Sequence, residues 1–217
     1  AHSQRWLQFP LTPKQVPLFR DHSHYVEWLK DKLSQGIMWN ERHLWTSVRP
    51  NGPSRPYDLN RLELRICDCI TNCDLLLAIT ALLELRILCL FEHPNRFDPV
   101  QVSSLSLAEL ADLSNLNDKA AAQNSLDATL YHWIDGQPIS CRDWIFQLIE
   151  EVMPIAQEMD MVDLLSPIYL VLEQGNQAMK WLKLHQSGQS VEDIVRESIV
   201  QMEVEENLST QTKAIFG

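Results

Sequence analysis

The chain has 217 residues, a length that suits one large domain or two small ones. Apolar residues make up 45% and charged residues 22%, as in ordinary globular proteins with a packed core. The formal net charge of -11 disfavours two classes, general nucleic-acid binders and proteins that adsorb to anionic lipid.

No stretch of the sequence resembles a membrane-spanning helix. The most apolar run, Leu75 to Phe91, is too short and is interrupted by Glu84 and Arg86. The first residues, Ala1 to Arg5, lack both the apolar core of a signal peptide and an initiator methionine. We therefore expect a cytoplasmic chain that starts partway through a longer protein, with no membrane and no nucleic acid among its partners.

Five cysteines without a secretory signal favour reduced thiols in a cytosol. Three of them are close in sequence and suggest a metal site, but their spacing matches no common zinc pattern. We favour small buried side chains for the cysteines. They are Cys67, Cys69, Cys73, Cys89 and Cys141.

The first predicted elements are a helix and a pair of strands. Asp21 or Ser23 can cap the helix, and Gly36 can end it. Residues 44–49 and 61–67 then alternate with period two, and the Pro- and Gly-rich segment between them excludes regular structure. This pattern predicts a hairpin of two strands joined by a long loop.

The rest of the chain reads mostly as helices. Residues 72–92 form a strongly apolar helix, which we expect to be buried on most sides, and residues 93–103 form a polar linker. Ser106 to Glu109 is a capping box that opens a short helix, and Asp135-Gly136 is a turn signal. Further helices are predicted at 117–125, from 141 toward 159, and at about 161–174, 176–186 and 190–206.

The two predicted strands concentrate basic residues. From Arg42 to Arg65 there are five arginines, no lysine and two acids, which gives 5 − 2 = +3 within an acidic chain. The planar fork of arginine suits carboxylate or phosphate groups, so an anion-binding site is one reading. A solvent-exposed sheet face is the alternative reading, and the residue types favour the two readings equally. Glu63 can be a salt-bridge partner or one ligand of Mg²⁺.

The segment from Asn40 to Asp68 resembles the cyanobacterial branch of the glutamate–cysteine ligases, within the wider carboxylate–amine ligase family. The resemblance rests on Trp45 followed by Arg49-Pro50, and on the strand Leu62-Glu63-Leu64-Arg65. Weaker similarity continues to about Glu192 and includes Glu173 to Ala178. The chain would correspond to the C-terminal portion of such an enzyme.

The resemblance implies an α+β fold, with a small antiparallel sheet portion of glutamine-synthetase type packed with a mainly helical remainder. Residues 1–73 would be the C-terminal part of the catalytic sheet with its preceding helix, and residues 74–217 the helical scaffold of the same domain. The implied reaction joins glutamate and cysteine into γ-glutamylcysteine, the first step of glutathione biosynthesis. It uses ATP and Mg²⁺ and passes through an acyl phosphate.

Carried onto this sequence, the family's motif assigns roles to five residues. Glu63 would ligate Mg²⁺. Arg65 would contact the ATP phosphates or the acyl phosphate, and Arg49 would bind a substrate carboxylate or the transferred phosphoryl group. His43 and Trp45 would line the same substrate pocket.

One departure from the family qualifies these roles. The family carries further acidic ligands in a G-x-E-x-E strand near its N-terminus, and no such pattern occurs here. We therefore expect the chain to be inactive alone and to need a missing N-terminal portion. Two alternatives stay open: a stand-alone helical module with a degenerate site and no catalysis, and a related carboxylate–amine ligase with a different amine substrate.

Overall fold

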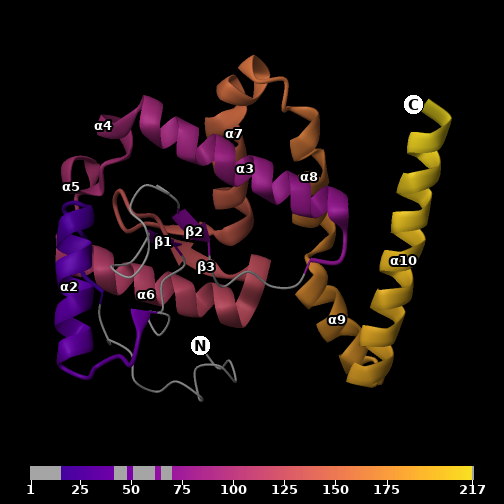
Figure 1. Ribbon diagram of the computed structural model, residues 1–217, viewed down its shortest axis with the longest axis horizontal. Coiled ribbons are helices and arrows are strands. Elements are labelled where there is room, and N and C mark those ends of the chain that lie inside the picture. The colour runs from indigo at the N-terminus through magenta and orange to yellow at the C-terminus, as the bar shows by residue number, and fades with distance from the viewer. Residues whose placement is uncertain (1–15, 42–47, 51–61, 65–69, 217) are drawn as a thin grey trace. The chain divides into compact units, whose positions relative to one another are not determined.

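The structure is a computed structural model that describes residues 16–41, 48–50, 62–64 and 70–216 (Figure 1). Helices dominate, and two short antiparallel strand pairs accompany them, which confirms the predicted α+β class. The chain divides into two compact units. The first comprises Ala1–Asp68 with Ser106–Asn115, and the second comprises Cys69–Leu105 with Leu116–Gly217.

Helix α2, His22–Ser34, organises the described part of the first unit. Its cap is local, since the Asp21 side chain accepts a hydrogen bond of 2.8 Å from the backbone N–H of His24. The helix ends before Gly36, whose φ of 69° suits glycine. Its inner face packs with Met38, which follows the helix, in a small apolar core of four buried residues: Tyr25, Val26, Leu29 and Met38.

Strands β1, Val48–Pro50, and β2, Leu62–Leu64, form an antiparallel pair in the first unit. The register aligns Val48 with Leu64 and Pro50 with Leu62. Strand β2 lies within its predicted range, whereas β1 continues one residue past the predicted end at Arg49, into Pro50, which was assigned to the loop. Antiparallel pairing agrees with the predicted hairpin. The remainder of each predicted strand lies outside the described residues.

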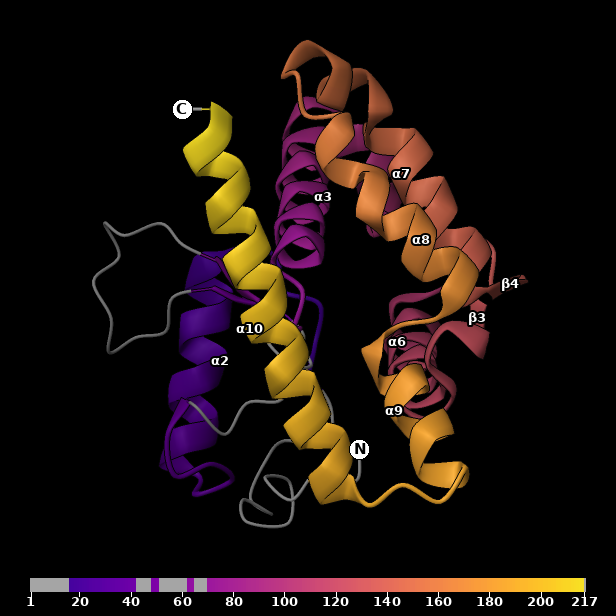
Figure 2. The same cartoon turned by 90° about the vertical axis from the view of Figure 1, so that its right-hand side faces the viewer.

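The second unit is built on α3, Cys73–Glu92, which packs against α7, Cys141–Glu158, and α8, Ser166–Gln174 (Figure 2). Asn72 caps α3 by accepting a hydrogen bond from the Leu75 N–H at 2.8 Å. The core combines mostly small side chains of α3 with mostly branched side chains of its neighbours. Its fully buried members include Ala78, Leu85, Ile149, Val152, Ala156 and Leu165.

The prediction that α3 is buried on most sides is wrong. Leu77 is 57% exposed and Phe91 is 76% exposed, whereas Leu85 is fully buried. The buried residues of α3 follow one another at intervals of three or four positions, so they share one face of the helix, and its apolar residues divide into a core face and a surface face. An apolar sequence predicts a helix that can be buried, but it does not say how many partners that helix has.

An ion pair accompanies this core. Arg86 of α3 donates to the carboxylate of Glu151 on α7, and both side chains are half-buried. The Arg86 guanidinium also lies 4.2 Å from the ring centroid of Phe97, in a cation–π arrangement. The pair joins α3 to α7 at the edge of the apolar contact.

Residues 93–103, predicted as a polar linker, instead form two short helices, α4 (Pro94–Phe97) and α5 (Pro99–Val102). Each begins with proline, whose fixed φ suits the first helical position. The Asp98 side chain caps α5 through the Val100 N–H at 2.9 Å. The polar linker predicted for this segment is therefore wrong.

Helix α6, Leu107–Asn124, opens at the predicted capping box. Ser106 and Glu109 exchange hydrogen bonds there: the Ser106 N–H donates to the Glu109 carboxylate at 2.8 Å, and the Glu109 N–H donates to the Ser106 hydroxyl at 3.3 Å. The helix is longer than predicted, because residues 107–124 form one helix rather than two.

A second strand pair follows, β3 (Thr129–Tyr131) with β4 (Pro138–Ser140). Gly136 lies in the connecting turn with a φ of 70°, in agreement with the predicted turn. The Asn117 side chain bonds to both backbone groups of Tyr131, accepting from its N–H and donating to its carbonyl, each at 2.8 Å. Ser140 then caps α7 through the Asp143 N–H at 3.0 Å.

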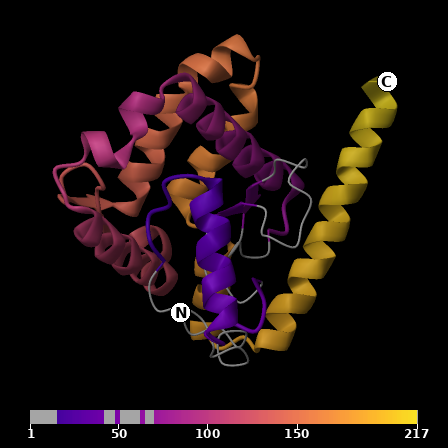
Figure 3. The ribbon, with the colours of Figure 1, turned by 60° about the vertical axis from the view of Figure 1, so that its left-hand side comes forward.

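The chain ends in α9, Gln177–Gln186, and the long helix α10, Val191–Phe216 (Figure 3). Two 3₁₀ turns, Ser125–Asp127 and Asp163–Leu165, precede β3 and α8. Among the described residues, no helix combines the length and apolarity that a membrane crossing requires.

Candidate functional site

The strand pair β1–β2 brings two of the predicted site residues into register. Arg49 is the direct partner of Glu63 across the antiparallel pair. Directly opposed positions of such a pair belong to one face of the sheet, with Cβ atoms about 5 Å apart. The Glu63 side chain is half-buried and takes part in an interaction within the structure. The register thus gives an arginine position opposite a carboxylate.

The other predicted site residues, His43, Trp45 and Arg65, lie outside the described residues. The roles assigned to them, and the roles assigned to Arg49 and Glu63, stay predictions. The division at residue 73 into sheet portion and scaffold is likewise a prediction.

Glu63 supplies part of the chemistry that Mg²⁺ needs. This cation prefers oxygen ligands, and proteins often hold it with one or two carboxylates, nucleotide phosphates and water. Within the described ranges, no group of three or more His, Cys, Asp or Glu side chains converges as a metal site. The described donor set therefore fits one protein ligand of a magnesium site, and not a complete ligand set.

The three described cysteines are free thiols in different environments. Cys89 is buried in the core, as predicted, whereas Cys73 is exposed and Cys141 is half-buried. Burial raises the pKa of the Cys141 thiol, which disfavours the reactive thiolate. Cys67 and Cys69 lie outside the described residues.

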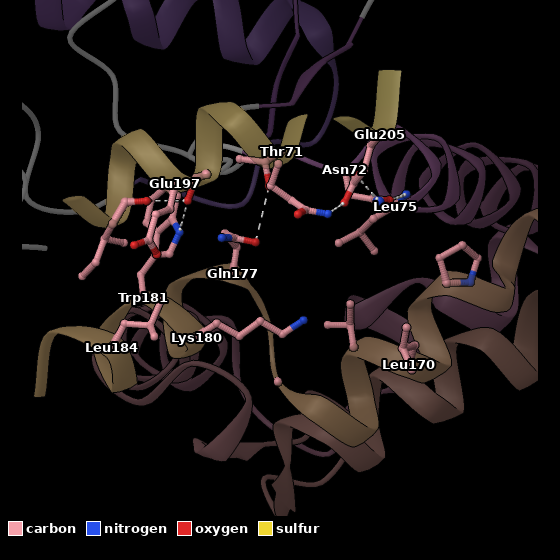
Figure 4. A pocket seen from close by; sticks show the side chains of 16 residues that line it. Thr71, Asn72, Leu75, Leu170, Gln177, Lys180, Trp181, Leu184, Glu197 and Glu205 are labelled. Carbon is pink, nitrogen blue, oxygen red and sulfur yellow. Dashed lines mark hydrogen bonds between the residues drawn. The ribbon is translucent and has the colours of Figure 1, made fainter. Parts of the chain in front are cut away.

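The second unit contains a groove that the sequence did not reveal (Figure 4). Its volume is about 510 Å³, and its walls come from α8, α9, α10 and the segment that leads into α3. Polar contacts connect these walls. Thr71 donates to Gln177 at 3.4 Å, Asn72 donates to Glu205 at 2.8 Å, and the Trp181 indole donates to Ser198 at 2.9 Å.

Charged side chains lie on two sides of this groove. Lys180 extends into it from α9, while Glu197 and Glu205 lie on α10 (Figure 4). Both oxygens of Glu197 accept hydrogen bonds from the Gln189 amide, at 3.0 and 3.2 Å. Leu75, Leu170 and other apolar side chains also line the groove.

Sequence reasoning missed the groove because its walls are far apart along the chain. Asn72 and Glu205 are 133 positions apart, and no local spacing relates them. One partial signal existed in the segment Glu173 to Ala178, which was noted only for its family similarity. Gly175 and Gln177 of that segment line the groove, and the Asn176 side chain caps α9 through the Met179 N–H at 3.0 Å.

Comparison with known proteins gives a consistent result over most of the chain. The family described as glutamate-cysteine ligase family 2 matches residues 2–201. A protein of Sorangium cellulosum, named putative glutamate--cysteine ligase 2, is 25% identical over 203 residues, which cover 93% of this chain and 50% of that protein. A protein of the same name from Leifsonia xyli is 24% identical over 175 residues, covering 80% of this chain and 43% of that protein.

A third relative, from Gloeobacter violaceus, carries the same name and is 23% identical over 179 residues. These residues cover 82% of this chain and 45% of that protein. The chain thus spans about half the length of the curated relatives it matches.

Proposed function

This chain belongs to glutamate-cysteine ligase family 2, and from that membership we propose that it contributes part of an ATP-dependent ligase that joins glutamate to cysteine. The product would be γ-glutamylcysteine, the starting compound for glutathione. Since the chain spans about half the length of its relatives, the remainder of the site would come from further polypeptide.

The observation that carries this proposal is the family match over residues 2–201, which includes the strand pair β1–β2. Arg49 stands opposite Glu63 in that pair. A ligase that activates a carboxylate with ATP must hold a metal ion and several anionic groups close together. An arginine position beside a carboxylate position offers one group for each task.

In the proposed site, Glu63 would hold Mg²⁺, which when bound neutralises negative charge on the phosphates. Arg65 would contact the phosphate oxygens, and Arg49 would bind the substrate carboxylate or the transferred phosphoryl group. His43 and Trp45 would line the substrate pocket. These groups position the reactants and stabilise charge rather than form covalent bonds.

The proposed reaction has two steps. The γ-carboxylate of glutamate attacks the γ-phosphorus of ATP, which forms an acyl phosphate and releases ADP. The cysteine amine then attacks the acyl carbon, loses a proton and expels phosphate as the amide bond forms.

The test is phosphate release by the protein as its gene encodes it, measured with glutamate, Mg-ATP and cysteine. Release that requires all three is the expected result. Release with alanine or glycine in place of cysteine, and none with cysteine, would identify a related ligase with a different amine. Absence of release with every amine would favour a module without catalysis and would overturn the proposal.

A further inference from the structure

Helix α3 presents a second face on the side opposite its core. The core face consists of Ala78, Ala81, Leu85 and Cys89, which follow one another at intervals of three or four positions. The same intervals recur about half a turn away, from the start of the helix to its end. These positions form the outer face of α3: Cys73, Leu76, Leu77, Thr80, Leu83, Glu84, Ile87, Leu90 and Phe91.

The outer face is long, apolar and accessible. It extends over about 27 Å from Cys73 to Phe91, at about 1.5 Å per residue. The exposed apolar side chains are Leu76, Leu77, Leu90 and Phe91, and the half-buried ones are Leu83 and Ile87. Monomeric soluble proteins rarely expose contiguous apolar patches of more than a few hundred Å², and larger patches mark interaction sites.

The composition of the outer face is that of a permanent interface rather than a transient one. Among its nine positions, all of which the structure describes, Glu84 alone is charged. Transient interfaces are about as polar as the rest of a protein surface, whereas permanent ones resemble a protein core cut in half. A partner that stays bound therefore suits this face better than one that dissociates.

The relatives provide a partner of this kind, because about half of their length lies outside the match. Helix α3 lies inside residues 2–201, which match the family. In the Sorangium cellulosum relative the matched residues are 50% of the protein, so as many residues again lie outside the match. When one core is shared by two halves of a fold, each half alone exposes the apolar surface on which the other half packs.

A second copy of the chain suits the outer face less well. Glu84 lies near the middle of α3, Cys73–Glu92. Two copies of α3 that pack antiparallel over their full length would therefore bring two Glu84 carboxylates together. Like charges that face each other at an interface cost free energy, which disfavours this pairing.

We propose that the outer face of α3 is the surface on which the remaining half of the ligase polypeptide packs. That polypeptide covers Leu77, Leu83 and Phe91 with apolar side chains. It places a cation or a hydrogen-bond donor opposite Glu84, because a buried carboxylate is costly without one. The inference rests on the part of the proposed function that calls for further polypeptide, and not on the reaction that the protein catalyses.

Cys73 is a native probe of the outer face. It is an exposed thiol, and tandem mass spectrometry of the digested protein distinguishes it from the other four cysteines. Its labelling by N-ethylmaleimide is compared between the 217-residue chain and the protein as its gene encodes it. We expect Cys73 to react about tenfold more slowly, or slower still, in the encoded protein, because a covered thiol is less accessible.

Two substitutions extend and control this measurement. Thr80→Cys places a thiol at the middle of the outer face and should show the same slowing. Glu203→Cys places a thiol at an exposed position of α10 outside the matched range, and it should react at the same rate in both proteins. Labelling does not measure catalysis, so its result is independent of the phosphate-release test.

Three results would overturn the proposal. The first is equal labelling in the two proteins, both at Cys73 and in Thr80→Cys. The second is slow labelling already in the 217-residue chain, because this chain would then cover the face itself or, if the rate falls as protein concentration rises, would cover it with a second copy. The third is equal slowing in Glu203→Cys, which would indicate a general loss of access rather than a covered face.

Discussion

The two units of this protein differ in how chemistry and packing are distributed. The described part of the first unit has a core of four buried residues around α2, and it carries the opposed Arg49 and Glu63. The second unit has a larger core on α3, α7 and α8, and none of the five predicted site residues lies in it. Substitutions that alter activity and substitutions that alter stability should therefore fall mostly in different units.

The largest effect is expected at the centre of the larger core. Leu85→Ala removes a fully buried side chain and should lower the free energy of unfolding by about 2–5 kcal/mol, because the vacated volume loses packing contacts. Urea unfolding of the 217-residue chain measures this change. Leu77→Ala, at a position on the same helix that is 57% exposed, should change stability by about 0.5 kcal/mol or less. Equal losses would contradict the division of α3 into two faces.

The next effect concerns the charge of Glu63. In the protein as its gene encodes it, Glu63→Gln should lower turnover by about 10²–10³-fold, because the amide cannot replace a carboxylate in holding Mg²⁺. The melting temperature should stay near that of the unmodified protein. The control is Glu84→Gln, at an exposed position of α3. Near-normal turnover in Glu63→Gln would remove this residue from the proposed site.

Arg65 tests whether geometry matters as well as charge. Arg65→Lys keeps the positive charge, but an ammonium group cannot make the bidentate contact with phosphate oxygens. We expect turnover to fall about a hundredfold. The exposed Arg196 pairs with Glu192 at 2.8 Å on the surface of α10, and Arg196→Lys should leave turnover unchanged. If Arg65→Lys is also neutral, a positive charge alone is sufficient at that position.

A smaller effect is expected at the start of α7. Ser140→Ala removes the side-chain acceptor of the Asp143 N–H and should cost about 1 kcal/mol in thermal or urea unfolding. Ser114, an exposed residue within α6, has no capping role, and Ser114→Ala should be neutral or slightly stabilising. A neutral Ser140→Ala would mean that water replaces the cap at little cost.

The smallest effect is a pH dependence at the start of α6. Hydrogen bonds from the Ser106 hydroxyl and backbone N–H hold the pKa of the Glu109 carboxyl below its usual value of 4.5. A depressed pKa in the folded state means that the contribution to stability is present above pH 4.5 and is lost as the pH falls through the lower folded value. Titration of the Glu109 side chain by NMR measures this pKa, and Ser106→Ala should raise it. An unchanged pKa in Ser106→Ala would contradict the capping box as its cause.

The features that the sequence predicted correctly depend on interactions between residues that are close together in the chain. Asp21, Ser106 and Ser140 begin helices as predicted, because a cap involves residues two or three positions apart. The exposed face of α3 was not predicted, since it depends on which distant helices pack there. The short helix that begins at Pro94 was missed because its four residues are too few to show a helical period in a polar segment.

The candidate site shows the same limit. The sequence around Arg49 and around Glu63 shows the alternation of polar and apolar residues that predicts each strand. The register that pairs these two residues then depends on only two short strands. The groove required Asn72, Lys180 and Glu197 to meet from three separate segments.

The side chain of Asn117 also bears on the open edge of the small sheet in the second unit. Strand β3 pairs with β4 along one edge, and its other edge would offer Tyr131 backbone groups to a strand of another molecule. The Asn117 amide occupies both of these groups, so it takes the place of an additional strand residue. A single side chain from α6 therefore closes the Tyr131 position of this sheet edge to a further strand.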